Sequence, residues 1–448
     1  MTLWIDVEDL FAYAAHHARP TGVQRFSCEI AAALVRGHGE GIGFLRHDPA
    51  GAGFRVITAE AVAAVYARMA DAPAAAPRAA RRAQRTGAQP RAGWLPREIR
   101  APLGRAWRAQ GEALRGGVEA LRALPALWRT PPPPALGAEL RRIARPGDVL
   151  AAFGSPWSEP GQAALLAREA AAIGARVAVL VHDMIPLDRP EFCDRVQIDA
   201  FAAHMRAALP GADIVFANSR ATAASILDWA AREGFALRGD PCVLPVGTRA
   251  LPAPGPLPDG LRAGGFVLMV GTLEARKNHW LAFRAWRRLI AEMPRGTVPP
   301  IVFAGRRGWM VDDLMQALEN SDWLGGMIRW VQEPDDATLS ALYQGCRFTL
   351  FPSHIEGWGL PVAESLAAGR PCIATGHGAI AEAAAGLTLP IDPDDVTATA
   401  ALLRRCLEQG DEMAALAARI RRDYGATPWS ATADAVMARL EMDARAVG

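Results

Sequence analysis

Two glutamates eight residues apart, Glu356 and Glu364, stand in the segment FPSHIEGWGLPVAESLAAGRPCIAT at residues 351–375. The pattern predicts a buried strand ending near residue 352, a glycine-rich loop at 357–360 and a helix over 362–368. Glycines let backbone N–H groups approach a ligand, a helix N-terminus favours negative charge, and carboxylates accept strong hydrogen bonds. The spacing therefore indicates a site for a hydroxyl-rich, phosphate-bearing ligand. The alternative is a strand–loop–helix unit with a solvated capping acid.

A second segment supplies the positive charge that such a ligand needs. VGTLEARKNHW, residues 270–280, follows a predicted strand and offers Gly271 for close approach, then Arg276 and Lys277. Arginine can grip a phosphate with two hydrogen bonds, and lysine acts as a point charge. The pair could therefore stabilise a diphosphate leaving group as its charge builds up, and Glu274 could orient one of the cations. The alternative is the solvated start of a helix.

A histidine and an aspartate follow another predicted strand. VHDMIPLDRPEF, residues 181–192, places His182 and Asp183 directly after the strand 176–181. Such a pair could bond sugar hydroxyls, and the histidine could relay a proton. A buried structural histidine is the alternative.

Two more segments place small or polar residues ahead of predicted helices. RPTGVQRF, residues 19–26, puts Gly22 before a helix predicted over 28–35, where a turn could lie beside a phosphate. Ser219 precedes a further helix, and we interpret it as an N-cap. FAGRRGW, residues 303–309, ends another strand, and Gly305 is expected to let the backbone approach a nucleotide.

The elements that must position these residues alternate between strand-like apolar runs and helical stretches rich in alanine and leucine. This alternation predicts an α/β fold with parallel sheets covered on both faces. Two series are separated by LPAPGPLPDG at 251–260, which is typical of an interdomain linker. Ligands of such folds bind outside the carboxyl ends of the strands, so we expect the site in a cleft between two domains. The predicted strands are 3–7, 149–153, 176–181, 214–217, 266–270, 301–304, 328–331 and 348–351.

The composition is that of a globular protein, with 448 residues, 51% of them hydrophobic and 21% charged. We find no apolar run of about 18 residues, so no transmembrane helix is predicted. The N-terminus MTLWIDVEDL lacks the basic region of a secretory signal, and we expect a cytoplasmic protein. The six cysteines are scattered without a C-x-x-C pair, which favours buried free thiols over a zinc site.

Residues 66–146 interrupt the alternation and are rich in alanine, arginine and proline. Fifteen arginines and four glutamates lie between residues 78 and 145, although the net charge of the whole chain is only +2. A basic amphipathic helix can lie on anionic lipid, so one hypothesis places this insertion at the inner face of the plasma membrane. The other is a solvated surface insertion. Apolar residues recur every seven positions, each followed by arginine: Trp107-Arg108, Leu114-Arg115, Leu121-Arg122 and Trp128-Arg129.

Taken together, these segments resemble the family 4 retaining glycosyltransferases, whose GT-B fold has two Rossmann-like, doubly wound domains facing across a cleft. The resemblance covers most of residues 266–395 and, in short pieces, the N-terminal half. Glu356 and Glu364 match the E-x7-E signature of that family. The resemblance implies that Glu364 holds the ribose of a nucleotide sugar, while Glu356 and the loop amides after it lie against the transferred sugar.

The resemblance also implies roles for the remaining segments. Arg276 and Lys277 would contact the diphosphate, Gly22 would belong to a loop closing over the nucleotide sugar, and His182 would lie near the hydroxyls of the transferred sugar. The residues expected in catalysis are His182, Asp183, Arg276, Lys277 and Glu356. The residues expected to bind the donor are Gly22, Gly271, Thr272, Arg276, Lys277, Gly305, Glu356, Gly357, Trp358, Gly359, Leu360 and Glu364.

The chain departs from the family pattern at three positions. Thr272 stands where many members have arginine, which places more of the phosphate binding on the basic pair. Gln24 stands where a second glycine is often seen. Ala381 replaces the usual proline before Glu382, so we interpret Glu382 as a structural helix cap.

The resemblance divides the chain into three parts. Residues 1–250 would form the acceptor-side domain, with the insertion at about 66–146. Residues 261–430 would bind the nucleotide sugar, and a final helix at 431–448 would cross back to the first domain.

We therefore expect a retaining hexosyltransferase that moves a sugar from a nucleoside diphosphate to a glycan or lipid-linked acceptor in polysaccharide or surface-glycan biosynthesis. The segments HDMIPL and GTLEARKNH favour mannose as the sugar. No Asp-x-Asp ends a predicted strand, so we expect neither a metal nor another cofactor, and no nucleic-acid partner is expected. Two other functions stay open, namely a sugar-nucleotide epimerase of the same fold and a non-catalytic scaffold that binds nucleotide sugar.

Overall fold

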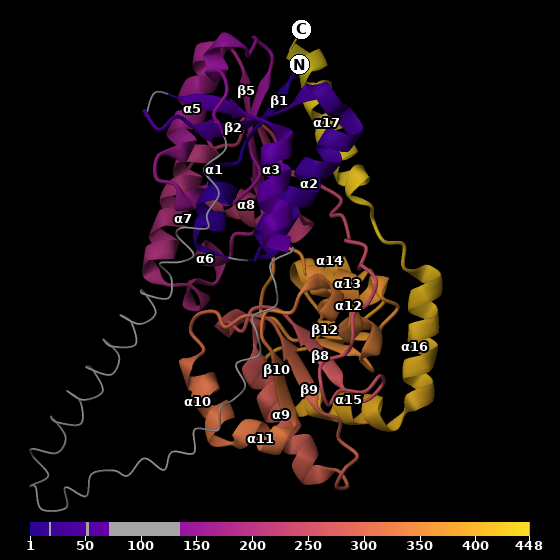
Figure 1. The fold of residues 1–448 in the computed structure, drawn as a ribbon. Helices are drawn as coiled ribbons and strands as arrows, with labels where there is room; N and C mark the ends of the chain where they lie inside the picture. The colour runs from indigo at the N-terminus through magenta and orange to yellow at the C-terminus, as the bar shows by residue number, and fades with distance from the viewer. Residues whose placement is uncertain (18, 51–52, 71–134, 448) are drawn as a thin grey trace, which may run out of the picture. The chain divides into compact units, whose positions relative to one another are not determined.

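Strands and helices alternate through the computed structural model, which describes residues 1–17, 19–50, 53–70 and 135–447. Within this part, the first half of the chain builds a sheet with the order β3-β2-β1-β4-β5-β6-β7 (Figure 1). β3 pairs antiparallel with β2, and the other neighbours pair in parallel. The strands are β1 (Leu3–Asp6), β2 (Ile42–His47), β3 (Phe54–Ile57), β4 (Val149–Ala152), β5 (Arg176–Val181), β6 (Ile214–Ala217) and β7 (Cys242–Val243).

Helices cover both faces of the first sheet because its strands bury side chains alternately on the two sides. In β1, Leu3 and Ile5 enter one hydrophobic cluster and Trp4 enters the other. The helices of this half are α1 (Glu8–His16), α2 (Gly22–His38), α3 (Ala59–Ala70), α5 (Gln162–Ile173), α6 (Ile185–Asp188), α7 (Arg195–Ala208) and α8 (Arg220–Glu233). α2 and α3 contribute to the first cluster, while α5, α7 and α8 contribute to the second.

The second half of the chain builds a parallel sheet with the order β10-β9-β8-β11-β12-β13. Its strands are β8 (Val267–Val270), β9 (Ile301–Ala304), β10 (Ile328–Val331), β11 (Thr349–Phe351), β12 (Cys372–Thr375) and β13 (Leu389–Ile391). They are short, and the central strands β9, β11 and β12 are buried on both faces, as expected for a parallel sheet between two helix layers.

Two layers of helices also enclose the second sheet. Its helices are α9 (His279–Glu292), α10 (Asp312–Asn320), α11 (Asp322–Gly326), α12 (Asp336–Gly345), α13 (Leu360–Ala367), α14 (Gly378–Ala384), α15 (Val396–Glu408) and α16 (Gly410–Asp423). α9, α10 and α15 pack on one face of the sheet. α12, α13 and α14 pack on the other. Both sheets belong to a single compact unit.

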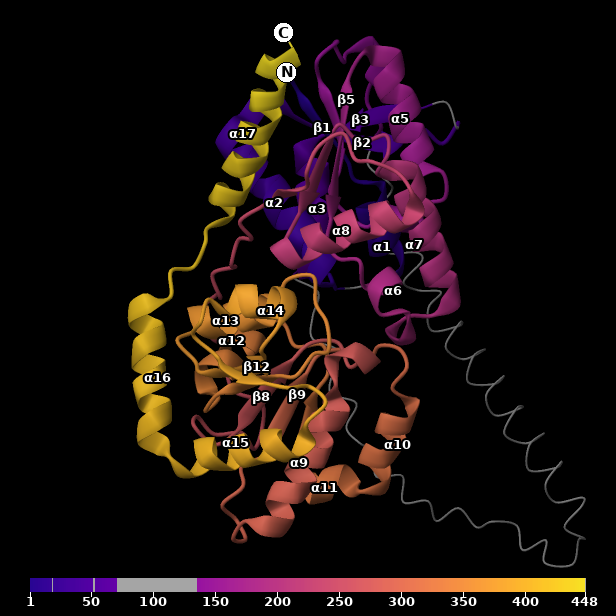
Figure 2. The same ribbon diagram turned by 180° about the vertical axis from the view of Figure 1, so that it is seen from behind.

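The last helix returns to the first sheet. α16 packs against α13, whereas α17 (Trp429–Val447) packs along α2, as the views in Figure 1 and Figure 2 both show. The buried apolar side chains of α17 recur mostly at three- and four-residue intervals, which places them on one helix face. They are Trp429, Ala433, Val436, Met437 and Leu440.

The proline-rich segment between the two series of strands packs against the second half of the chain. Residues 251–260 contain no helix or strand, but they lie along α12. Ser340 Oγ donates a hydrogen bond to the carbonyl of Pro252 over 2.7 Å, and the amide of Gly255 donates to the carbonyl of Ala337 over 2.9 Å.

The insertion was predicted at about 66–146. Where the structure describes the two ends of this range, they pack into the core of the first half. Met69, in α3, is buried in the first cluster, because the apolar stripe of that helix continues past residue 66. Leu140 is fully buried in the second cluster, and the amide of Gly137 donates to the carbonyl of Val56 in β3 over 2.8 Å. The arginine repeat at 108–129 lies outside the described residues.

The predicted α/β class with doubly wound sheets is confirmed. All the predicted strands are present, as β1, β4, β5, β6, β8, β9, β10 and β11. The strands β2, β3, β7, β12 and β13 were not predicted. β2 and β3 carry Arg46, His47 and Arg55, whose charges break the apolar run, and β7 is only two residues long.

Two further sequence features are visible in the fold. The six cysteines are free thiols, and four of them are buried. Among the described residues, no helix combines the length and the apolar character that crossing a membrane requires.

We predict that Leu440→Ala lowers the free energy of unfolding by about 2–5 kcal/mol, because Leu440 is fully buried and its removal leaves a cavity between α17 and the first sheet. Urea unfolding followed by circular dichroism measures the change. Met442→Ala is the matched control, since Met442 is 65% exposed on the same helix. Equal stability of the two variants would show that α17 does not dock as described.

Candidate functional site

One cavity of about 710 Å³ is lined by residues that follow strands of both sheets. His182 and Asn218 follow β5 and β6, and Gly271 and Gly305 follow β8 and β9. The cavity brings together every residue predicted from the sequence to act in catalysis or donor binding, while their individual roles stay predictions. They are Gly22, His182, Asp183, Gly271, Thr272, Arg276, Lys277, Gly305, Glu356, Gly357, Trp358, Gly359, Leu360 and Glu364.

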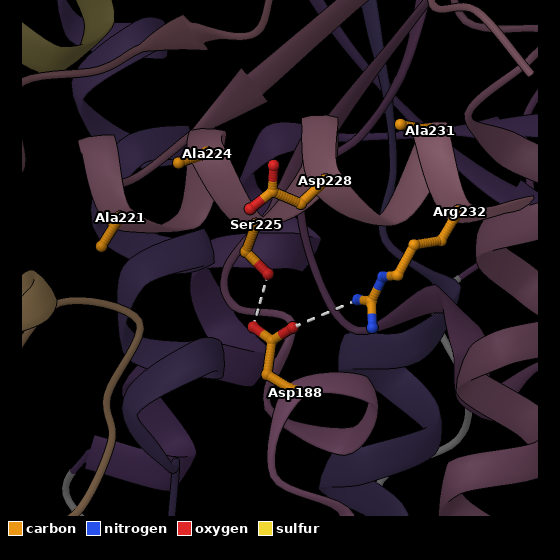
Figure 3. Close-up of a pocket in the computed structure, with 7 residues that line it drawn as sticks. All are labelled: Asp188, Ala221, Ala224, Ser225, Asp228, Ala231 and Arg232. Carbon is orange, nitrogen blue, oxygen red and sulfur yellow. Dashed lines mark hydrogen bonds and ion pairs between the residues drawn. The ribbon is translucent and has the colours of Figure 1, made fainter.

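A second cavity, of about 620 Å³, lies between α6 and α8. Asp188 accepts a hydrogen bond there from Ser225 Oγ and lies 3.9 Å from Arg232 Nη2 (Figure 3). Its carboxylate is thus already paired, and no residue predicted for catalysis or donor binding lines this cavity. The first cavity is therefore the candidate site.

A cluster of buried charges joins the loop after β8 to the loop after β11. Glu356 lies 2.6 Å from Arg276 Nη1 and accepts a hydrogen bond from Lys277 Nζ. Arg276 Nη2 lies 2.7 Å from Glu274 Oε1, and Glu274 is only 2% exposed. Lys277 also lies over the ring of Phe351, with its Nζ 5.0 Å from the ring centroid. The two cations and two carboxylates balance one another.

The pKa values of this cluster follow from burial and from the pairing. Burial alone would raise the pKa of Glu356, but Arg276 and Lys277 outweigh it and hold that pKa at about 2. Burial lowers the pKa of Lys277, and the charge of Glu356 offsets part of that effect. Glu356 is therefore a carboxylate at neutral pH. Removing one member of an ion pair in this cluster would leave a buried charge without its partner.

His182 sits at the end of β5 as a buried, neutral imidazole. Its Nε2 lies 2.9 Å from the carbonyl oxygen of Phe153, which can only accept, so Nε2 carries the proton. Burial lowers the pKa of His182 to about 4. At neutral pH its Nδ1 can accept a hydrogen bond from a hydroxyl, but the ring is not charged for proton donation. The proton relay considered from the sequence stays a prediction.

Asp183, the neighbour of His182, is also buried. Its Oδ1 accepts the amide of Ile185 over 3.1 Å. Burial raises its pKa, and the charge of Arg276 counters that effect. The carboxyl group thus lies within the field of the basic pair.

Glu364 lies in α13, on the same cavity, with a partner that the sequence did not reveal. Tyr343 Oη donates a hydrogen bond to Glu364 Oε2 over 2.8 Å. Burial raises the pKa of Glu364, and the charge of Arg25 opposes the rise. Among the described residues, no hydrogen bond reaches the second carboxylate oxygen, Oε1, which could accept from another donor. Tyr343 is 21 residues before Glu364 in the chain, and no spacing rule links the two.

An ion-pair network near Glu364 was also missed. Arg25 of α2 lies 3.0 Å from Asp336 of α12, and Arg249 lies 2.7 Å from the same carboxylate. Glu29, one helical turn after Arg25, lies 3.7 Å from Arg249. This network connects the first sheet's helix α2 to the second sheet's helix α12, so only the fold brings its members together.

Two glycines expected to approach a ligand instead let the chain approach itself. A Cβ at Gly357 would come within 1.9 Å of the carbonyl oxygen of His182, and one at Gly305 within 2.0 Å of the carbonyl oxygen of Gly271. The amide of Gly305 donates to Val331 and its carbonyl accepts from Trp330 Nε1. The backbone of Gly305 is thus bonded within the protein, while its contact with a nucleotide stays a prediction.

The helices that follow the two predicted loops, at 19–26 and 357–360, begin earlier than expected. Gly22 is the first residue of α2, where Thr21 and Gln24 form a capping box. Gln24 thus takes a capping role at the position of the expected second glycine. Leu360 is the first residue of α13. Among the described residues, no acceptor lies within reach of the buried indole N–H of Trp358.

Ser219 and Glu382, both interpreted as helix caps from the sequence, have structural partners. Ser219 Oγ accepts the amide of Thr222 over 3.0 Å, which confirms the predicted N-cap of α8. The carboxylate of Glu382, in α14, accepts the amides of Arg220 and Ala221, each over 2.9 Å. Glu382 therefore caps a helix, as interpreted from the sequence, but that helix is α8 on the other sheet. Within the described ranges, no group of three His, Cys, Asp or Glu side chains is placed to hold a metal ion.

Comparison with known proteins identifies the second half of the chain. Residues 263–423 match the model of the family of glycosyl transferases group 1. Serotype-specific mannosyltransferase WbdA of Escherichia coli is 29% identical over 217 residues, 45% of this chain and 26% of that protein. O-antigen chain mannosyltransferase B of Escherichia coli is 33% identical over 144 residues, 32% of this chain and 37% of that protein. The chain thus matches less than two thirds of the length of these relatives.

A solved structure supports the fold of both halves. An α,α-trehalose-phosphate synthase (UDP-forming) from Burkholderia xenovorans, in complex with glucose-6-phosphate, aligns with a TM-score of 0.51 at 16% identity. The alignment covers 67% of this chain and 74% of that chain. The predicted GT-B fold is therefore confirmed.

The neutral state of His182 predicts a pH-dependent loss of stability. A histidine whose pKa is about 4 when folded and 6.5 when unfolded takes up its proton preferentially in the unfolded chain, so stability falls as the pH drops below 6.5. The contribution lost between pH 7 and pH 5 is about 2 kcal/mol. Urea unfolding at both pH values should show this loss in the wild type and a smaller one in His182→Asn, whose amide can still donate to Phe153. Identical losses would mean that His182 is not buried in this state.

Proposed function

We propose that the chain is a retaining glycosyltransferase that moves a mannosyl residue from a guanosine diphosphate sugar to a glycan or lipid-linked acceptor in surface-glycan or polysaccharide biosynthesis. The observation that carries the proposal is the buried pairing of Glu356 with Arg276 and Lys277 in the cavity that also holds Glu364. These residues lie in the part of the chain that matches the model of the group 1 glycosyltransferases.

The charge cluster suits a diphosphate leaving group. Arg276 and Lys277 are paired with carboxylates in the structure, so an arriving diphosphate would compete with Glu356 for them. Its charge grows as the glycosidic bond breaks, and preorganised cations stabilise that growing charge most in the transition state. Glu356, released in part from the cations, would accept hydrogen bonds from sugar hydroxyls. The acceptor would attack from the face that the leaving group departs, which retains the configuration.

The remaining residues would position the donor. Glu364 has one oxygen engaged by Tyr343 and a second that could accept ribose hydroxyls. His182, with an accepting Nδ1, could hold a hydroxyl of the transferred sugar. Arg276 and Lys277 supply positive charge at the site, so we propose that transfer needs no bound metal. Mannose as the sugar is supported by the relatives, two of which are mannosyltransferases.

Two substitutions should separate donor binding from the chemical step. Glu364→Gln keeps an acceptor for Tyr343 but loses the charge, and Glu364→Ala loses both, so donor affinity should fall by about 1.5–3 kcal/mol in the alanine variant and less in the glutamine variant. Lys277→Ala should lower kcat more than donor affinity. Calorimetry with GDP-mannose and a transfer assay, each with and without EDTA, give the two readouts. Glu292→Ala, an exposed carboxylate of α9, is the control.

The results of these measurements also distinguish the proposed transferase from an epimerase and from a scaffold. Unchanged donor affinity in Glu364→Ala would count against the ribose assignment, and full turnover in Lys277→Ala would place the diphosphate elsewhere. A product formed equally without acceptor would indicate an epimerase. Donor binding with no turnover for any acceptor would indicate a scaffold. Loss of transfer in EDTA, restored by a divalent ion, would refute the metal-free mechanism.

We further propose that the protein is cytoplasmic and that residues 78–145 hold it at an anionic inner-membrane surface. Replacing Arg108, Arg115, Arg122 and Arg129 with glutamine should abolish co-sedimentation with phosphatidylglycerol vesicles while donor affinity is kept. The binding should weaken with salt, because the Debye length falls from about 10 Å at 0.1 M to about 3 Å at 1 M. Phosphatidylcholine vesicles are the control. A wild type that ignores anionic vesicles at low salt refutes the membrane role.

A further inference from the structure

Within the described residues, one part of the cavity wall is lined by uncharged side chains, with Asp183 and the thiol of Cys193 next to it. The turn Pro156–Ser158 and the helices α6 and α7 contribute Trp157, Ile185, Pro186, Gln197 and Phe201 to the lining. The loops after β8 and β11 instead contribute the charge cluster of Glu274, Arg276, Lys277 and Glu356. The cavity therefore has a charged part suited to a diphosphate and an uncharged part that the proposed donor site does not use.

The uncharged wall is centred on an aromatic pair with an amide beside it. The rings of Trp157 and Phe201 meet edge to face, with their centroids 5.2 Å apart and an interplanar angle of 68°. Phe201 is 1% exposed and packs against the indole. Gln197 lies four residues before Phe201 in α7, so both side chains are on one face of the helix.

The polar atoms of this wall are free for a ligand. Within the described residues, the indole N–H of Trp157 and the side-chain amide of Gln197 make no hydrogen bond with the protein, and Gln197 uses only its backbone amide, which donates to Asp194. An indole offers one donor, and a primary amide offers two donors and an acceptor. This set matches the hydroxyls of a sugar, while the indole face matches its C–H surface.

A buried carboxyl group holds the turn that carries Trp157. Asp9 accepts the amide of Ser155 over 2.6 Å and the hydroxyl of Ser155 over 3.1 Å. Gln24, fixed by its capping box, donates to Ser155 Oγ over 3.4 Å. A Cβ at Gly154 would come within 2.1 Å of Asp9 Oδ2, so the chain approaches this carboxyl closely. The wall is therefore held in place before a ligand arrives, which lowers the entropic cost of binding.

This wall also lies beside the expected reaction centre. Phe153, four residues before Trp157, accepts the hydrogen bond of His182. His182 and Trp157 thus follow neighbouring strands, β5 and β4, and line the same cavity.

On the premise of the proposed function, we infer that Trp157 and Gln197 bind an uncharged sugar ring at the end of the acceptor. A phosphate group at this position would lose its water without gaining a cation, because the wall offers none, and such desolvation is costly. A neutral pyranose loses far less, since its hydroxyls can bond to the amide and the indole N–H. The acceptor is thus a glycan terminus, and any phosphate of a lipid carrier lies beyond this wall.

The test uses the full chain with GDP-mannose as donor and two kinds of acceptor, p-nitrophenyl α-mannosides and mannose 6-phosphate. Wild type should transfer to the neutral mannosides. Trp157→Ala should raise the KM for the neutral acceptor about tenfold or more, with the donor Kd from calorimetry within about twofold. Trp157→Phe, which keeps an aromatic face, should recover most of the loss, and Gln197→Ala should raise the same KM. Trp280→Ala, a half-buried tryptophan of α9 outside the cavity, is the matched control.

Each outcome decides between separate claims. An acceptor KM that does not change in Trp157→Ala overturns the inference, as does a wild type that binds the donor but transfers only to mannose 6-phosphate or to no neutral mannoside. If calorimetry with a panel of nucleotide sugars finds no donor at all, the proposed function itself fails. A raised donor Kd in Trp157→Ala, with the fold kept by circular dichroism, would assign Trp157 to the donor instead.

Discussion

The carboxylate of Glu356 holds two cations in a nearly dry site, and the geometry of the donor half depends on that pairing. Burying one charge without a partner is strongly unfavourable, whereas a balanced group of four can be kept if each member is paired. Arg276 and Lys277 follow β8, while Glu356 follows β11. These strands are neighbours in the second sheet, so the pairing fixes two adjacent loops relative to each other at its carboxyl edge. A diphosphate would then bind by exchanging partners with a carboxylate, and not by attracting a free cation.

A second constraint is the close approach of backbone segments around the same cavity. The signature loop lies so near the end of β5 that position 357 has no room for a side chain, and Thr222 Oγ1 also donates to the carbonyl of Gly357 over 3.4 Å. Glu382 of α14 caps α8 on the first sheet. Both contacts join a loop or helix of the second sheet to the first. The glycine of the signature is therefore required by packing between the halves, as well as by anything that it contributes to ligand binding.

Sequence reasoning succeeded where a residue's role depends on its near neighbours in the chain. The eight long apolar runs became strands because each could bury both faces without a partner being specified. The site residues were found because parallel strands collect their carboxyl ends at one edge. Sequence reasoning failed for contacts between segments that are far apart in the chain. Tyr343, Asp336 and Arg249 carry no local signal for a role near Glu364. The packing around Gly305 and Gly357 was not foreseen, because only the fold shows which atom fills the space of the missing Cβ. Helix starts at Gly22 and Leu360 were missed because a capping box and a proline at the second position extend both helices toward the cavity.

The distribution of charge within the cavity assigns different work to its parts. The buried charge cluster follows β8 and β11, where the proposed leaving diphosphate would need positive charge. Burial lowers the pKa of His182 to about 4, so its ring is neutral at pH 7, and burial raises the pKa values of Asp183 and Glu364. The wall of Trp157 and Gln197, as far as the structure describes it, is lined by uncharged side chains. A catalyst of group transfer gains when charge is stabilised only where it develops. An uncharged acceptor wall serves that purpose. A cation in this wall would bind an anionic acceptor as tightly in the ground state as in the transition state. Such uniform binding would not raise the rate.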